Sequence, residues 1–224
     1  MYAAIIIVFI IVIFAFVVPK LNEKNKREDY TEVFSENSSA KANSVIHACQ
    51  SMAVLSTKFI NSVHDVIDKE FIVDDSIIKL DLNIVALFWV RFKCTLGCND
   101  ASAVKAITRA IITYFSLEAE KQFGIKQEKF IEVADNRLPV FDEIYMKSTD
   151  PRDFVKTLLT ELGILLAHDI VNEGYKPFSL SSPTPIIGIG QQSMIDLSVA
   201  EFIENYDDAV NIHISTVRKN YYMD

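Results

Sequence analysis

The sequence lacks the features that mark several large functional classes. Its 224 residues include only three cysteines, Cys49, Cys94 and Cys98, and this small, odd number does not fit a disulfide framework. Cys94 and Cys98 are separated by three residues, a weaker metal or redox signal than C-x-x-C, and no second pair accompanies them. We therefore expect ordinary reduced thiols at all three positions.

Concentrated positive charge is also missing. The net charge is −8, and the only clustered basic residues lie between Lys20 and Arg27. Because phosphate binding requires many lysines and arginines on one surface, nucleic acid is not expected as a main partner. The short basic run is better suited to contact lipid headgroups.

Familiar catalytic motifs do not occur either. The sequence contains no H-E-x-x-H motif, no E-x-x-H pair of the di-iron kind and no G-x-S-x-G. The segment Gly188-Ile189-Gly190 resembles half of a phosphate-cradling loop, but it lacks the third glycine and the lysine, and a Pro- and Gly-rich turn explains it equally well. We assign no catalytic, cofactor-binding or metal-binding residue and expect no cofactor, which favours a protein that is not an enzyme.

Two His-Asp pairs, His64-Asp65 and His168-Asp169, are similar in outline to those of HD-type phosphohydrolases. The spacing argues against such a site, because His47 and His64 would point about 100° apart on one helix. Helix faces supply two ligands at best, whereas a catalytic zinc site requires three. A membrane-tethered, metal-dependent phosphohydrolase using these two pairs is the alternative function, and stoichiometric Mn, Fe or Zn in the purified protein would support it.

Charge is absent from the first nineteen residues, and Ala3 to Val18 are all apolar. About nineteen residues rising roughly 1.5 Å each span about 28 Å, close to the hydrocarbon thickness of a bilayer. A cleaved signal peptide is the competing interpretation, but no basic residue precedes the run and no A-x-A site follows it. We expect a transmembrane anchor at 1–19 that contacts the bilayer through residues 3–18.

Flanking charge predicts the orientation of this anchor. Four basic residues, Lys20, Lys24, Lys26 and Arg27, follow the apolar run, and only the terminal amine precedes it. The positive-inside rule then places the C-terminal domain of a single-pass membrane protein in the cytoplasm. Protease protection in sealed vesicles tests this orientation.

The rest of the chain divides into two regions by composition. Residues 20–42 are charged and then rich in serine and asparagine, which predicts a linker. Residues 43–224 carry apolar residues at three- and four-residue steps, which predicts an all-α globular domain. The expected fold class is therefore all-α, with a single N-terminal transmembrane helix followed by a helical bundle of about six helices.

The apolar rhythm and the breaker residues predict six helices in this domain. They cover approximately residues 44–70, 82–96, 100–123, 126–147, 150–173 and 193–221. Residues 77–84 are ambiguous because they alternate as a half-buried strand would, but the solidly apolar stretch after them favours a helix from 82. A break or kink is expected before Pro139, and a long loop is expected at 174–192.

Particular residues are predicted to begin and end these helices. Asn43 or Ser44 is placed to cap the first helix, and Asn99 or Asp100 to cap the third. Gly97 and Gly124 are placed to terminate the helices before them. Asp150 followed by Pro151 predicts a further helix start, with Gly174 at the far end.

These patterns favour a membrane-anchored, non-catalytic interaction or adaptor module with a protein partner. The apolar stripe of the last helix could pack on its own domain or on a partner helix, and own-domain packing is favoured. A third possibility is a sensor domain that binds a small apolar molecule between helices, and a cavity near Trp89 would favour it.

Overall fold

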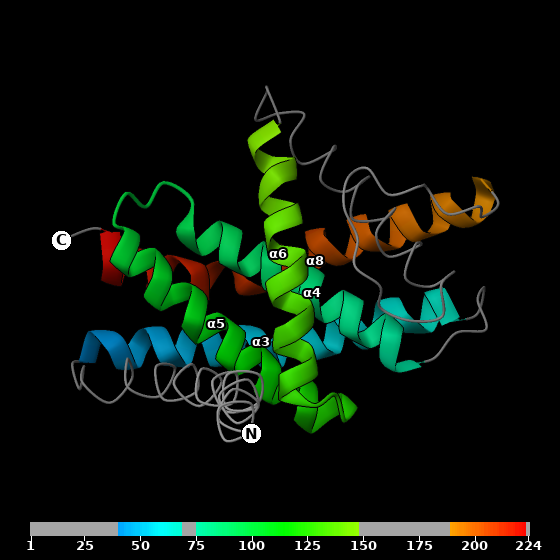
Figure 1. Cartoon of the computed structure of the whole chain (residues 1–224), viewed down its shortest axis with the longest axis horizontal. Coiled ribbons are helices and arrows are strands. Elements are labelled where there is room, and N and C mark those ends of the chain that lie inside the picture. Colours follow the sequence, from blue (N-terminus) through cyan, green and yellow to red (C-terminus); the bar gives the residue numbers. More distant parts are fainter. Residues whose placement is uncertain (1–39, 69–74, 148–188, 223–224) are drawn as a thin grey trace, which may run out of the picture. The chain divides into compact units, whose positions relative to one another are not determined.

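Five α-helices form the part of the chain that the computed structural model describes, residues 40–68, 75–147 and 189–222. They are α3 (Ala40–Asp68), α4 (Asp75–Thr95), α5 (Ala101–Phe123), α6 (Gln127–Lys147) and α8 (Ile189–Tyr222) (Figure 1). No strand occurs in these ranges, so the all-α prediction is confirmed for them. The expected anchor at 1–19, most of the linker and the expected helix at 150–173 lie outside the described residues. Among the described helices, none is long and apolar enough to cross a membrane.

The central helix of this bundle is α4. Every residue from Leu80 to Val90 is buried, and the helix packs against α5, α6 and α8. A helix that is buried around its circumference must be apolar on nearly all sides. This explains the solidly apolar stretch that the sequence shows after residue 84.

The strand alternative for residues 77–84 is wrong, and α4 begins at Asp75, seven residues before the favoured start. Two of the three polar members of the alternation, Asp81 and Asn83, are buried rather than turned to water, and Lys79 is half-buried. The side-chain amide of Asn83 donates to the carbonyl of Lys79, one turn earlier, at 2.9 Å. The helix itself therefore provides an acceptor for the amide of Asn83, and the alternation does not mark an exposed strand face.

Aromatic side chains join α4 to α6, which crosses α4 and α5 in Figure 1. The ring of Phe88 meets Phe141 edge to face at 4.9 Å between centroids, and Phe92 meets Tyr145 at 5.2 Å. Such pairs add roughly 0.5–1.5 kcal/mol beyond the area they bury. They explain how α6 stays attached although its average hydrophobicity is low.

The helix ends agree in part with the predicted caps. Asp100 is the N-cap of α5, where its carboxylate accepts from the amides of Ser102 at 2.8 Å and Ala103 at 3.3 Å. Gly124 ends α5 with a φ of 69°, a conformation that favours glycine because it carries no Cβ. The predicted cap at Asn43 or Ser44 is wrong, since α3 already begins at Ala40.

Of the two outcomes predicted before Pro139, the break is wrong and the kink stays a prediction. A single helix, α6, runs from Gln127 to Lys147 with Pro139 inside it. Proline cannot donate to the carbonyl four residues earlier, and that cost is smallest where water reaches the backbone. Pro139 lies on the exposed side of α6, which is consistent with an uninterrupted helix.

The last helix begins earlier than expected. α8 starts at Ile189, so residues 189–192 of the predicted loop are helical, and the rest of that loop lies outside the described residues. Its core residues pack on α3, where Tyr206 is fully buried and its hydroxyl donates to the carbonyl of Met52 at 2.9 Å. Own-domain packing of the apolar stripe is therefore confirmed.

Candidate interaction surface

The first His-Asp pair lies where α3 ends and α4 begins. His64 is buried, with Nδ1 3.8 Å from the carboxylate of Asp65 and Nε2 in contact with the carboxylate of Asp75. Lys79 also pairs with Asp75 at 2.6 Å, and Lys79 and His64 together lower the pKa of Asp75. These contacts form a polar cluster, with the Lys79–Asp75 ion pair within it, that joins two helix ends.

The metal-site hypothesis stays a prediction. His168 and Asp169, the second pair, lie outside the described residues. Within residues 40–68, 75–147 and 189–222 no group of three or more His, Cys, Asp or Glu side chains could hold a metal ion. His47 is exposed whereas His64 is buried, in agreement with the divergent directions that their spacing predicts.

All three cysteines are free thiols. Cys49 and Cys94 are fully buried, and burial raises the pKa of both, that of Cys94 to about 12. Because the thiolate is the reactive form, these two side chains behave as small apolar core residues. Cys98 is partly exposed, and its sulfur lies 3.6 Å from the carbonyl of Asp100.

Trp89 is buried and hydrogen-bonded to α8. Its ring is 5% exposed, and Nε1 donates to the carboxylate of Asp207 on α8 at 3.0 Å. A half-open hollow of about 280 Å³ lies near the start of α4 and the α5–α6 connection, lined in part by Leu80, Asp81 and Ile125. Trp89 is not among the residues that line this hollow, and the sensor hypothesis stays a prediction.

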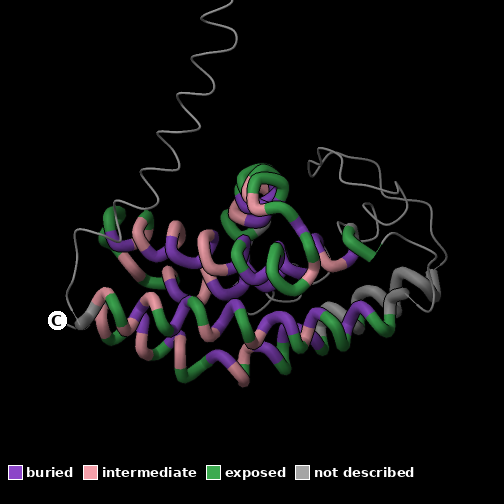
Figure 2. The backbone as a smooth tube through the Cα atoms, turned by 90° about the horizontal axis from the view of Figure 1, so that it is seen from below, coloured by how far each residue is buried: buried purple, intermediate pink, exposed green. Residues whose placement is uncertain are grey.

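The helix α8 has two contrasting faces. Buried residues recur along it at three- and four-residue steps, and exposed ones lie between them (Figure 2). The buried set is Phe202, Ile203, Tyr206, Val210, Ile214 and Val217. The exposed residues from Leu197 to Ser215, which we call the outer face of α8, are Leu197, Glu201, Glu204, Asn205, Asp208, Asn211, Ile212 and Ser215. Lys219, one turn beyond Ser215, is also exposed.

Two large apolar side chains stand on the outer face. Leu197 is 69% exposed and Ile212 is 76% exposed. They lie fifteen positions apart, which corresponds to about 22 Å along a helix. Single exposed leucines are ordinary, but two of the most exposed apolar residues of the described part share one face of one helix.

Three carboxylates of the outer face, those of Glu201, Glu204 and Asp208, lie between these two residues. Among the described residues, the side chains of Glu201, Glu204 and Asp208 take part in no hydrogen bond or ion pair. The stretch from residue 189 to 217 contains five acidic residues and no lysine or arginine. Like charges three or four residues apart destabilise a helix by roughly 0.2–0.5 kcal/mol per pair, so this arrangement opposes the stability of α8.

Asp207, the remaining described acid of this stretch, serves the fold instead. It accepts from Trp89 and from the ammonium of Lys93 at 3.1 Å, and its side chain is only 22% exposed. Lys93 also lies 5.6 Å from the centre of the Trp89 ring. The four acids of α8 whose side chains are described therefore divide into one that fixes the helix to α4 and three that face solvent.

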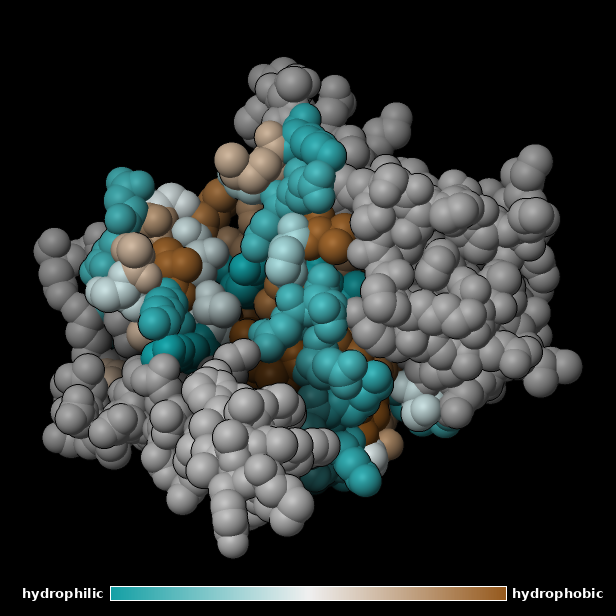
Figure 3. All heavy atoms as spheres, viewed as in Figure 1, coloured by the Kyte–Doolittle hydropathy of each residue, from teal (hydrophilic) through white to brown (hydrophobic). Residues whose placement is uncertain are grey.

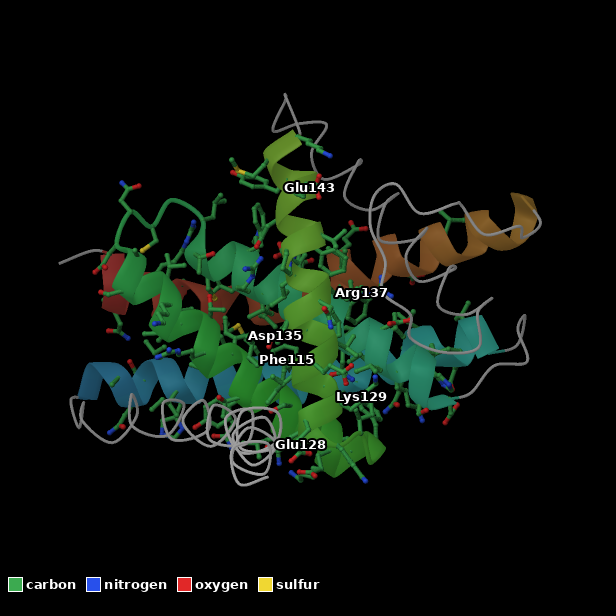
Figure 4. All side chains as sticks on the ribbon, in the orientation of Figure 1. Phe115, Glu128, Lys129, Asp135, Arg137 and Glu143 are labelled. Carbon is green, nitrogen blue, oxygen red and sulfur yellow. The ribbon has the colours of Figure 1, made fainter. Side chains whose placement is uncertain are left out.

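The surface of α6 is organised differently. Hydrophilic side chains run along this helix, and Asp135 and Glu143 extend from it (Figures 3 and 4). Glu132 pairs with Lys129 at 3.4 Å, Glu143 pairs with Lys147 at 2.5 Å, and Asp142 pairs with Arg91. These three carboxylates of α6 thus have a cation beside them.

Sequence reasoning identified the apolar stripe of the last helix but missed its outer face. A signal was present, because a stretch of 29 residues with acidic but no basic side chains departs from the mixed charge of the other helices. Leu197 and Ile212 also fall outside the apolar stripe.

Comparison with protein-family models, curated protein sequences and solved structures finds no match to this chain.

Proposed function

We propose that this protein is a membrane-anchored, non-catalytic interaction module that presents the outer face of α8 to a protein partner. The observation that carries the proposal is the unneutralised acidic stripe between two exposed apolar residues, Leu197 and Ile212. A feature that opposes helix stability without serving the core is expected where a surface has a binding role.

The membrane half of the proposal rests on sequence. The uncharged run from Ala3 to Val18 is long enough to span a bilayer, and the basic residues after it favour a cytoplasmic domain. Full-length protein should remain with membranes after alkaline washing, and protein lacking residues 1–19 should not. Protease added to sealed vesicles should then reach the helical domain only from the cytoplasmic side.

Deleting α8 is not a usable test of partner binding, because its inner face is part of the core. Two asparagines provide a better pair of positions. Asn205 on α8 and Asn136 on α6 are both exposed, and each donates to the carbonyl four residues earlier, at 2.9 Å and 2.8 Å. Replacing either one should perturb its helix to the same small extent.

A photo-crosslinking amino acid at each position, in full-length protein in its native membrane, tests the proposal. Position 205 should give a discrete adduct of higher mass, and position 136 should not. Equal labelling at both positions, or no adduct at 205, would contradict the proposal. Membrane recovery of each variant serves as the control for correct targeting.

A further inference from the structure

Resting on the proposed function, we infer that the occupant of the outer face of α8 is a basic amphipathic helix of a partner protein. Its apolar residues would pack on Leu197 and Ile212, and its lysines or arginines would face the three carboxylates between them. The charge pattern of α8 and the spacing of its exposed residues carry this inference.

The spacing sets a template for the partner. Glu201, Glu204, Asp208 and Ile212 lie four, seven, eleven and fifteen positions after Leu197. At about 100° per residue these positions fall within one narrow sector of the helix. A second helix lying along this sector needs apolar residues fifteen positions apart with basic residues three or four positions from one another between them.

Charge complementarity favours this occupant over others. An anionic lipid surface or a nucleic acid would bring phosphates against Glu201, Glu204 and Asp208, which like-charge repulsion disfavours. A second copy of the same chain, bound through this face in a two-fold contact, would oppose carboxylates to carboxylates. A cationic helix neutralises the stripe and relieves the repulsion between its members.

The contact should be weak and sensitive to salt. Two apolar anchors about 22 Å apart do not form the continuous seam of a stable coiled coil. Exposed charge pairs across an interface act mainly on the association rate and are screened by ions. A partner held in this way would exchange readily, which suits recruitment at a membrane.

The probe for this inference is a synthetic helical peptide on an alanine and glutamine background. It carries leucines fifteen positions apart, with lysines four, seven and eleven positions after the first, and a control peptide has glutamate in place of each lysine. Binding to full-length protein in nanodiscs is measured by fluorescence anisotropy. The lysine peptide should bind, with affinity falling about tenfold on raising salt, and the glutamate peptide should not.

Matched charge reversals test whether the outer face is the site. The triple variant Glu201→Lys, Glu204→Lys, Asp208→Lys should weaken binding of the lysine peptide by about tenfold or more. The control variant Glu132→Lys, Asp135→Lys, Glu143→Lys changes the net charge equally but places it on exposed positions of α6. Equal losses in the two variants would mean non-specific attraction and would overturn the inference.

The apolar anchors require a separate variant. Leu197→Ser with Ile212→Ser should also weaken binding, and an unchanged affinity would overturn the two-anchor template. Circular dichroism and Trp89 emission confirm that each variant is folded.

The peptide and crosslinking results together separate the inference from the proposed function. If the lysine peptide does not bind while position 205 still crosslinks to another protein, this inference is wrong and the proposed function stands. If the adduct at 205 is a dimer of the chain, the self-association alternative replaces the inference.

Discussion

The exposed faces of α6 and α8 use acidic residues in opposite ways. On α6, carboxylates such as Glu132 and Glu143 lie beside lysines of the same helix, and Asp142 pairs with Arg91 of α4. On α8, Glu201, Glu204 and Asp208 have no such neighbour among the described residues. The first pattern is that of a solvated helix face, and the second leaves a local negative field that a cationic partner could neutralise.

The inner sides of the two helices differ as well. α8 contributes a fully buried phenol at Tyr206 to the contact with α3, whereas Tyr145 near the end of α6 is 39% exposed. At this pair of tyrosines, the contact made by α8 is the more deeply buried one. A rigid core position is what a recognition surface requires, because side chains on a fixed helix are presented in a fixed geometry.

The largest expected difference concerns these two tyrosines. Tyr206→Ala should lower the free energy of unfolding by about 3–5 kcal/mol, because it leaves a cavity and removes the hydrogen bond to Met52. Tyr145→Ala should cost about 1 kcal/mol, since the ring is partly in water and mainly loses its contact with Phe92. Urea denaturation followed by circular dichroism compares the two, and similar losses would contradict the asymmetry.

A smaller difference is expected for the acids that fasten each helix to α4. Asp207→Ala should destabilise by about 1–3 kcal/mol, because it leaves the buried indole N–H of Trp89 without its acceptor. Asp142→Ala removes the ion pair with Arg91. Because the carboxylate of Asp142 is 51% exposed, this loss should cost about 0.2–1 kcal/mol. Trp89 emission should shift in the first variant only, and a shift in both would contradict this division.

Neutralising one exposed acid should change the stability of the domain differently on the two helices. Glu204→Gln relieves repulsion with Glu201 and Asp208 and should stabilise the domain by about 0.2–0.5 kcal/mol for each relieved pair. Glu132→Gln removes the pair with Lys129 and should leave stability unchanged or slightly lower. Thermal unfolding at low ionic strength measures both, and destabilisation by Glu204→Gln would show that this carboxylate is not opposed by its neighbours.

The smallest effect concerns pH and sharpens the same distinction between paired and unpaired acids. Lys79 and His64 lower the pKa of Asp75 below its ordinary value of 3.8. Its ion pairs therefore contribute stability that is present above pH 3.8 and is lost as the pH falls towards the lowered value. Asp75→Asn should reduce the difference between the free energy of unfolding at pH 6 and that in acid. If the free energy of unfolding of this variant falls with pH as that of the wild type does, the cluster does not stabilise the fold.

Much of the bundle could be predicted because its signals are local. Asp100 and Gly124 mark helix ends through the chemistry of their own residues, and the apolar rhythm of α5 and α8 follows from helical geometry. Pro139 misled for the opposite reason. Its cost depends on whether water reaches that turn of α6, and this is a property of the tertiary structure.

The outer face of α8 was harder to predict because it is defined by what lies beside it. The sequence shows Glu201, Glu204 and Asp208 as helical acids, but whether a lysine of another helix reaches them depends on packing. Asp207 illustrates the difficulty, since it is adjacent to Asp208 in the chain and yet pairs with Lys93 of α4. Only the three-dimensional arrangement separates the acid that fixes the fold from the acids available to a partner.

The hydrogen bond from Tyr206 to Met52 joins residues 154 positions apart, and it has a consequence for biosynthesis. On the ribosome, α3 is synthesised well before α8, which packs on it. The apolar side of α3 therefore lacks its contacts with α8 during most of translation. A nascent chain in this condition is a substrate for chaperones and proteases. Products that terminate before α8 should therefore be cleared rather than accumulate as a smaller folded form.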